Sequence, residues 1–310
     1  MTTGKCHVMG IVLLSLCLGM GPLAWGQAPT AGPARLKVAA TIFPLYDLVR
    51  NVAGPAVQVL LVVPPGVSEH TFEVRASTVR TLAGSAAVFA IGHGLDDWVT
   101  RLAREAGVGQ TIVPDAQVSL QRGEPEHTGH RQGDAPGARH DAVEPHYWLS
   151  IPNALAMVQS IAEALERLDP AGQAAYQQRA AAYREQLQSA DTAIRQLLAN
   201  LPRRDIATFH GAFSYFAAAY GLNVIATFEP VPGKEPGPRA VEMFVRQVRA
   251  ANLRVLFLEP QLSAAPLRGL AQDLGVSLRM LDPLGGGAGR ESYIAMMQFN
   301  AAQIAAALRE

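Results

Sequence analysis

The longest regular pattern in the chain is PAGQAAYQQRAAAYREQLQSADTAIRQLLANLP, residues 170–202. Its apolar side chains recur in alternating steps of four and three residues, which is the spacing of one face of an α-helix. They are Tyr176, Ala180, Tyr183, Leu187, Ala190, Ile194, Leu197 and Leu201. Asp169 fits a helix N-cap followed by proline at the first helical position, and Pro202 ends the pattern. The sequence therefore predicts one helix over 170–202, about 50 Å long at about 1.5 Å per residue.

The same periodicity allows a coiled-coil arm as an alternative. Two tyrosines and two alanines make a poor zipper seam, because such seams are normally lined by branched aliphatic residues. We therefore expect a rod that lies along two flanking lobes.

Both flanks of this helix alternate between strand-like and helix-like stretches. On the N-terminal side we expect strands at 36–41, 57–63 and 86–91 and helices at 76–83 and 152–168. On the C-terminal side we expect strands at 205–209, 223–228, 255–259 and 277–281, separated by helices at 211–220, 239–251 and 264–274. Such alternation is typical of open α/β sheets. The sequence thus predicts an α/β fold with one lobe over 36–169 and a second over 203–310.

The first 26 residues have the pattern of a secretory signal. Lys5 gives a positive start, an apolar run begins at Ile11, and Ala24-Trp25-Gly26 has the small residues of a cleavage site. Residues 27–35, rich in Pro, Gly and Ala, would then form a linker. We expect an exported, soluble, periplasmic protein rather than a membrane span, because glycines and a proline interrupt the apolar run.

A lipid anchor on Cys17 is the alternative for this segment, but Leu16 directly before it is bulkier than lipoprotein processing normally accepts. The other cysteine, Cys6, also lies in the signal, so the mature chain would have no thiol. Disulfides, cysteine-ligated zinc and thiol catalysis are therefore excluded for it. The 26 basic and 26 acidic residues balance, which gives no electrostatic case for binding nucleic acid.

Four polar side chains stand where apolar runs or loops give way to the next element. His210 and Asp282 directly follow predicted strands, and ligands of open α/β sheets bind at that edge. His70 follows Pro64-Pro65-Gly66, and His146 is flanked by Pro145 and two aromatic residues. Each histidine alone is more often an ordinary surface or core residue. If they converge, three imidazoles and one carboxylate would form a zinc-like site.

The stretch 123–141 lacks periodicity and combines Gly, Pro and charge, so we expect a loop within the first lobe. Its histidines, His127, His130 and His140, could trap zinc weakly, but a simple spacer is an equal alternative. We expect His93 to be a surface residue, and Phe213, Phe216 and Tyr220 to be core.

Six segments carry a family resemblance. They are PPGVSEHTFEV (64–74), EPHYWL (144–149), FHGAFSYFAAAYGL (209–222), PGKEPGPR (232–239), LEPQLS (258–263) and LDPLGG (281–286). In order and spacing they resemble the periplasmic receptors of zinc and manganese ABC importers. The resemblance implies two lobes joined by one long rigid helix over 170–202, with the metal in the cleft between the lobes.

By position, the resemblance implies that the metal ligands are His70, His146, His210 and Asp282. Glu69 resembles an acidic residue that can stand near the metal in zinc importers, so the fourth ligand is Asp282, Glu69 or water. Manganese receptors of this kind tend to have glutamate at the third position, where this chain has His210. Because three imidazoles favour zinc over the harder Mn²⁺, we predict Zn²⁺, with Mn²⁺ as the alternative.

The predicted function is a monomeric receptor, not an enzyme, that captures Zn²⁺ and delivers it to an ABC permease in the inner membrane. The first alternative is a zinc hydrolase or hydratase with a metal-bound water and Glu69 or Glu259 as general base. No nucleophile elbow or HExxH motif supports it. The second alternative is a structural zinc in an adhesin-like protein.

Overall fold

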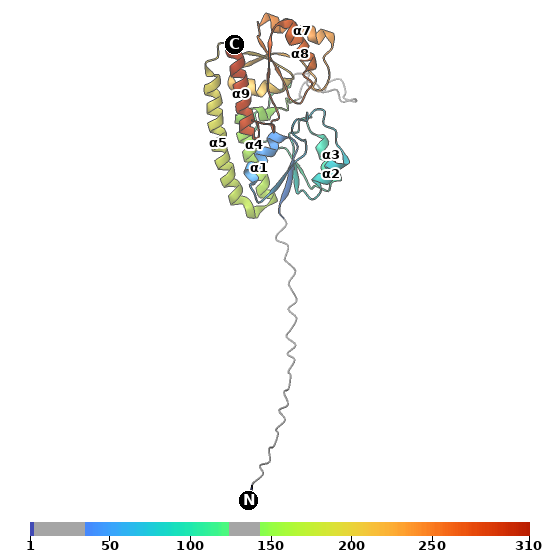
Figure 1. Ribbon diagram of the computed structural model, residues 1–310, viewed down its shortest axis with the longest axis vertical. Coiled ribbons are helices and arrows are strands. Elements are labelled where there is room, and N and C mark those ends of the chain that lie inside the picture. The colour runs from blue at the N-terminus through green and yellow to red at the C-terminus, as the bar shows by residue number, and fades with distance from the viewer. Residues whose placement is uncertain (3–34, 124–142) are drawn as a thin grey trace. The chain divides into compact units, whose positions relative to one another are not determined.

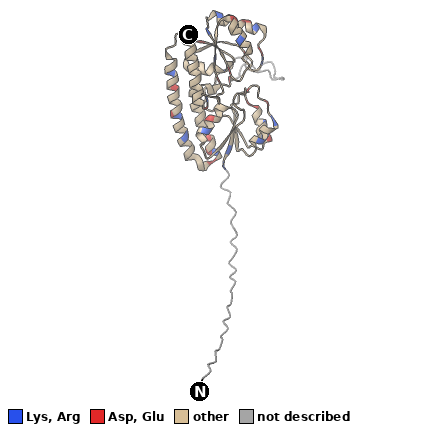
Figure 2. Cartoon of the chain, viewed as in Figure 1, with Lys and Arg blue, Asp and Glu red and all other residues tan. Residues whose placement is uncertain are grey.

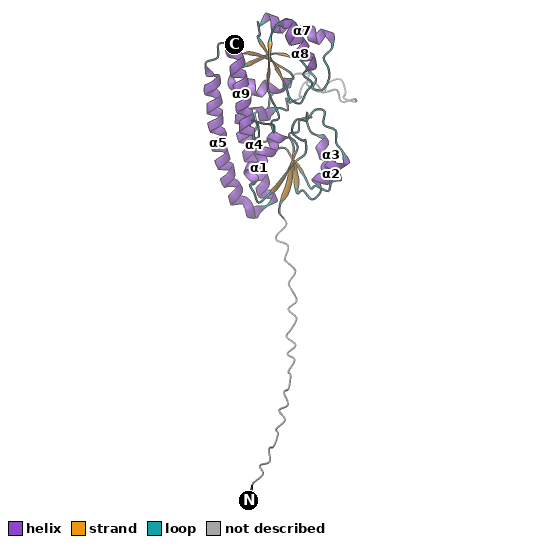
Figure 3. Ribbon diagram, in the orientation of Figure 1, coloured by secondary structure: helices purple, strands orange, loops and turns teal. Residues whose placement is uncertain are grey.

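Parallel strands form the centre of each half of the fold, as Figures 1 and 3 show. The computed structural model describes residues 1–2, 35–123 and 143–310, and Arg35–Glu310 form one compact unit. In the first half, four parallel strands lie in the order β2-β1-β3-β4. They are β1 (Lys37–Ala40), β2 (Gln58–Leu61), β3 (Ala87–Phe89) and β4 (Thr111–Ile112). Val38 of β1 lies opposite Val59 and Ala87, so the central strand is apolar and covered on both sides.

The second half contains two parallel strand pairs. These are β5 (Asp205–Thr208) with β6 (Asn223–Thr227), and β7 (Val255–Leu258) with β8 (Ser277–Met280). β5 and β7 lie next to each other, and the main-chain N–H of His210, after β5, donates to Glu259, the residue after β7, so the carboxyl ends of the two strand pairs lie together. The expected α/β class with two lobes is confirmed.

Helices connect and cover these strands. They are α1 (Phe43–Ala53), α2 (Ala76–Leu82), α3 (Trp98–Glu105), α4 (Ile151–Leu168), α5 (Gln173–Ala199), α6 (Ser214–Tyr220), α7 (Pro238–Ala250), α8 (Ala265–Leu274) and α9 (Tyr293–Arg309). α6 and α8 both end at a glycine in the left-handed conformation, Gly221 with φ 67° and Gly275 with φ 65°. Glycine adopts this conformation without a Cβ clash, which is why the helices end there.

The long helix α5 contacts α1 and α4 of the first half and α6 and α9 of the second (Figure 1). It has 27 residues, fewer than expected, because Pro170–Gly172 form a separate 3₁₀ turn and the helix ends at Ala199, before Pro202. Asp169 stands at the N-cap of this 3₁₀ turn with Pro170 after it, as expected, but its side chain makes no capping hydrogen bond: the carboxylate accepts a hydrogen bond from the Tyr176 hydroxyl at 2.7 Å. Near the C-terminal end Leu198, not Leu197, is the fully buried residue.

One large apolar core runs through both halves. It joins β1 and α1 to α4, α5 and α9, and it reaches Phe213 and Leu281 beside the C-terminal strands. Two smaller clusters lie under α2 and α3 and under α7 and α8. Residues of both charges are spread along α5 (Figure 2). The long helix is therefore a shared wall of the main core.

Candidate metal centre

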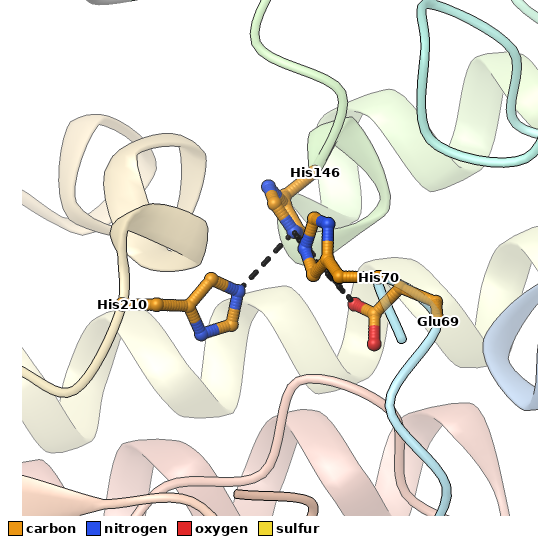
Figure 4. A group of neighbouring side chains, drawn as sticks. All are labelled: Glu69, His70, His146 and His210. Atoms are coloured by element: carbon orange, nitrogen blue, oxygen red, sulfur yellow. Dashed lines mark hydrogen bonds and ion pairs between the residues drawn. The ribbon is translucent and has the colours of Figure 1, made fainter. Parts of the chain in front are cut away.

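Three imidazoles and one carboxylate converge in the structure (Figure 4). Glu69, His70, His146 and His210 each offer one ligand atom, and these atoms all lie within 4.8 Å of one another. The Nε2 atom of His146 lies 3.2 Å from Nε2 of His70 and 3.3 Å from Nε2 of His210. Two nitrogens bound to one tetrahedral zinc at about 2.0–2.1 Å are about 3.3 Å apart. The spacing of the rings therefore matches a tetrahedral metal site.

Loops and strand ends hold these four side chains. Glu69 and His70 follow β2 in the loop stiffened by Pro64-Pro65, while His146 directly precedes a 3₁₀ turn, Tyr147–Leu149. His210 follows β5, as the sequence predicts, and precedes the turn Gly211–Phe213. The ring planes of His70 and His210 cross at 82°, so the rings meet edge to face rather than stack.

The cluster is buried and includes one carboxylate oxygen without a well-formed hydrogen bond among the described residues. Glu69, His146 and His210 are 4%, 3% and 2% exposed, and His70 is partly exposed. The Oε1 atom of Glu69 is buried and accepts no hydrogen bond within the described part of the chain. It lies 3.8 Å from Nε2 of His70 and 3.7 Å from Nε2 of His146. A buried carboxylate normally has partners, so this oxygen fits the fourth corner of a cation site.

The charges of the cluster shift its pKa values in different directions. Burial acts to raise the pKa of Glu69, but attraction to His70 and His146 outweighs it and leaves that pKa at about 2. Burial lowers the pKa of His70 to about 3, although Glu69 opposes the shift. Burial also acts to lower the pKa of His146, but the carboxylates of Glu144 and Glu69 raise it to about 9.

Asp282 lies outside this group. Its Oδ2 atom pairs with Nε of Arg290 at 2.8 Å. Its Oδ1 atom accepts hydrogen bonds from Nε2 of Gln261 at 2.7 Å and from the backbone N–H groups of Leu284 and Gly285 at 3.0 and 2.9 Å. The structure thus places Glu69 beside the three histidines, whereas Asp282 binds the backbone of the turn at Leu284 and Gly285.

Two further carboxylates lie against the Nδ1 atoms of His146 and His210, on the side of each ring that faces away from the cluster. Glu144 contacts Nδ1 of His146, and Glu259 lies with Oε2 2.6 Å from Nδ1 of His210. From the sequence we considered Glu259 only as a candidate general base, and we did not identify Glu144. The sequence does point to both positions, because Glu259 directly follows the strand Val255–Leu258 and Glu144 stands two residues before His146.

The other singled-out residues lie elsewhere. His93 is partly exposed and its Nε2 atom lies 2.8 Å from Oδ2 of Asp115. Phe213, Phe216 and Tyr220 are core residues, as expected. His127, His130 and His140 lie outside the described residues. Among the helices that the structure describes, none has the length and apolar character needed to cross a membrane.

Comparisons with known proteins agree on one family. The family model for ZnuA, the periplasmic component A of zinc-uptake complexes, matches residues 38–307. The chain is 27% identical over 300 residues to the zinc-binding lipoprotein AdcA of Streptococcus pneumoniae strain R6, covering 94% of this chain and 59% of AdcA. It therefore spans little more than half the length of that relative.

Solved structures give the same result. A crystal structure of ZnuA matches with a TM-score of 0.77 at 26% identity, covering 88% of this chain and 99% of that one. The solute-binding protein FpvC of Pseudomonas aeruginosa, solved with Mn²⁺, matches with a TM-score of 0.75 at 29% identity, covering 89% and 99%. With its two α/β lobes and its converging histidines, the chain belongs to the ZnuA family of periplasmic zinc-uptake components.

Proposed function

We propose that this chain is a periplasmic receptor that captures Zn²⁺ and delivers it to an ABC permease in the inner membrane. The observation that carries the proposal is the buried group of three imidazole nitrogens and one carboxylate oxygen. Such a donor set suits zinc better than manganese, which prefers more oxygen ligands. The names of the relatives AdcA and ZnuA support zinc, and the Mn²⁺ complex of FpvC makes manganese the competitor to test.

We propose His70, His146 and His210 as ligands, with Glu69 as the fourth in place of Asp282. The Oε1 atom of Glu69 supports this choice, because it accepts no hydrogen bond within the described residues, whereas both oxygens of Asp282 already have partners. With four protein ligands the metal has no open position for an activated water, so binding rather than hydrolysis follows.

The surrounding parts of the chain follow from this role. We propose residues 1–26 as the export signal, 27–35 as a linker, 36–169 and 203–310 as the lobes and 170–202 as the bridge between them. The receptor would work as a monomer. Because relatives such as AdcA are named lipoproteins, anchoring through Cys17 is the alternative form, and mass spectrometry of the exported protein distinguishes the two.

Calorimetric titration of the chelator-stripped protein tests the function. We expect one tightly bound Zn²⁺ per chain, weaker binding of Mn²⁺, and loss of the tight site in His210→Ala. His93→Ala is the matched control, because His93 pairs with Asp115 outside the cluster. A wild-type protein without a tight zinc site, or a site that survives the loss of His210, contradicts the proposal. Zinc-dependent ester hydrolysis or CO₂ hydration would favour the hydrolase instead.

A further inference from the structure

Two of the three clustered histidines are held from behind by a buried glutamate. Glu144 places Oε1 on Nδ1 of His146 and also accepts the main-chain N–H of His146 at 3.2 Å. Glu259 places Oε2 2.6 Å from Nδ1 of His210 and accepts the main-chain N–H of His210 on Oε1 at 3.2 Å. Both glutamates are buried, at 4% and 1% exposure. A glutamate thus lies against Nδ1 and accepts the main-chain N–H in both histidines, once in each half of the fold. The ring contact of Glu144 has hydrogen-bond geometry, whereas that of Glu259 is a close ion-pair approach without it.

The chemistry of imidazole gives this arrangement a consequence. A neutral imidazole carries one proton, and the partner of one ring nitrogen decides where that proton sits. A carboxylate on Nδ1 keeps the proton there, so Nε2 is the nitrogen left for a metal. In both histidines Nε2 is the atom that faces the other rings.

We propose that Glu144 and Glu259 are positioning residues that fix the Nδ1–H form and the ring direction of His146 and His210 for metal capture. This inference rests on the proposed function. Because each glutamate binds both the ring and the main chain of its histidine, it fixes the side chain relative to the backbone. His146 and His210 thus form a prearranged pair.

His70 differs from this pair. No carboxylate lies on its Nδ1 atom in the part of the chain that the structure describes, and its side chain is 19% exposed. It shares one loop with Glu69, so these two neighbours form the half of the site that adapts when the metal arrives. Glu259 lies against Nδ1 of His210, the ring nitrogen that faces away from the cluster. It is therefore not placed to act as a general base at the metal.

The test substitutes each glutamate separately in the full mature chain and measures zinc affinity by competition with a chelator. Glu144→Gln and Glu259→Gln should each weaken zinc binding about 10–100-fold, since outer carboxylates of this kind typically contribute that much. Glu229→Gln is the matched control. Glu229 is a buried carboxylate that acts on His210 through its charge, but it pairs with no histidine ring nitrogen within the described residues. Its substitution should change zinc affinity less than about threefold.

A second readout separates positioning from general structural support. In zinc-loaded protein labelled with ¹⁵N at histidine, the Nδ1–H protons of His146 and His210 should resonate far downfield. Glu144→Gln should shift only the His146 signal, and Glu259→Gln only the His210 signal. If a glutamine variant does not fold, the aspartate variant of the same residue replaces it, because its shorter side chain withdraws the carboxylate from Nδ1.

The outcomes are distinguishable. If wild-type protein binds no zinc, the proposed function fails. If wild-type binds zinc and the folded variants bind it equally well, or Glu229→Gln weakens binding as much as they do, this inference alone is overturned. Unchanged Nδ1–H signals in the variants would overturn it as well.

Discussion

Glu69 is a buried anion whose neighbours are the histidines of the cluster. It is buried, its pKa is held at about 2 by the neighbouring histidines, and Oε1 accepts no hydrogen bond in the described part of the chain. Asp282 is equally buried but fully engaged by Arg290, Gln261 and the backbone. Glu69 therefore has a buried oxygen without a hydrogen-bond partner among the described residues, whereas both oxygens of Asp282 have partners.

This difference predicts opposite effects of two isosteric substitutions. Glu69→Gln should weaken zinc binding more than tenfold and leave the metal-free fold intact. Asp282→Asn should leave zinc affinity nearly unchanged but lower the free energy of unfolding by about 1–3 kcal/mol, because it weakens a buried charged hydrogen-bond network. Chelator competition and urea unfolding measure the two quantities. The reverse pattern would identify Asp282 as the fourth ligand.

The pKa of His146 predicts that zinc binding releases a proton. In the metal-free cluster Glu144 and Glu69 raise this pKa to about 9, so at pH 7 the ring carries a second proton. Zinc needs the Nε2 lone pair and must displace that proton, so affinity should rise as pH increases from 6 toward 9. Calorimetry at pH 7 in buffers of different ionisation enthalpy should show about one proton released per zinc. Binding that is independent of pH over this range contradicts the assignment.

For single residues, the local pattern placed His70, His146 and His210 at strand ends and in loops, and only the family resemblance implied that they share one metal site. It left the fourth ligand open between Asp282, Glu69 and water. The choice depends on contacts that form only in the folded chain: Arg290 neutralises Asp282, and nothing in the sequence around either carboxylate specifies that contact.

Among the elements, most strands and the long regular helix were predictable, and several others were not. α5 shows its buried face as a repeat in the sequence, whereas α9 is buried on most sides and has no polar face to give a period. The short β4, with two residues, and α3 were not predicted either. The absence of a side-chain cap at Asp169 has a tertiary cause, the hydrogen bond from Tyr176.

The loop that carries Glu69 and His70 is held by a close contact at Gly233. This glycine has a φ of 77°, and a Cβ built on it would lie 2.4 Å from Cγ2 of Thr71, the residue after His70. Gly289 has nearly the same φ, 76°, but has no atom within 4 Å of such a Cβ. The two glycines therefore share a backbone conformation that disfavours a side chain, and they differ in whether a neighbour lies close.

Alanine substitutions of these two glycines should distinguish the cost of a side chain at positive φ from the effect of the contact with Thr71. Gly233→Ala and Gly289→Ala should each lower the free energy of unfolding by about 1 kcal/mol, because a side chain is disfavoured at positive φ. Only Gly233→Ala should displace Thr71 and speed zinc dissociation, which stopped-flow mixing with an excess of chelator measures. Equal dissociation rates in the two variants would show that the contact does not hold the ligand loop.

For the molecule as a whole, one continuous core limits how far the halves can move. The core includes α1, α4, α5 and α9 together, and buried hydrogen bonds cross between distant segments. Nε1 of Trp148 donates to the carbonyl of Pro283 at 2.8 Å, and the hydroxyl of Tyr293 donates to the carbonyl of Trp148 at 2.6 Å. Rotating one half against the other would break these bonds and expose the core.

We therefore predict that zinc is taken up and released mainly by movement of loops. Small-angle scattering of the metal-free and zinc-loaded protein should give nearly superimposable curves, because closing the halves would require the main core to separate. Hydrogen exchange should become slower around Glu69 and His70 on zinc binding and remain unchanged in the middle of α5. Zinc at 100 times its dissociation constant should also raise the free energy of unfolding by about 2.7 kcal/mol. A large decrease in the radius of gyration on zinc addition would show instead that the core divides and that the long helix bends, so capture would then depend on closure of the lobes.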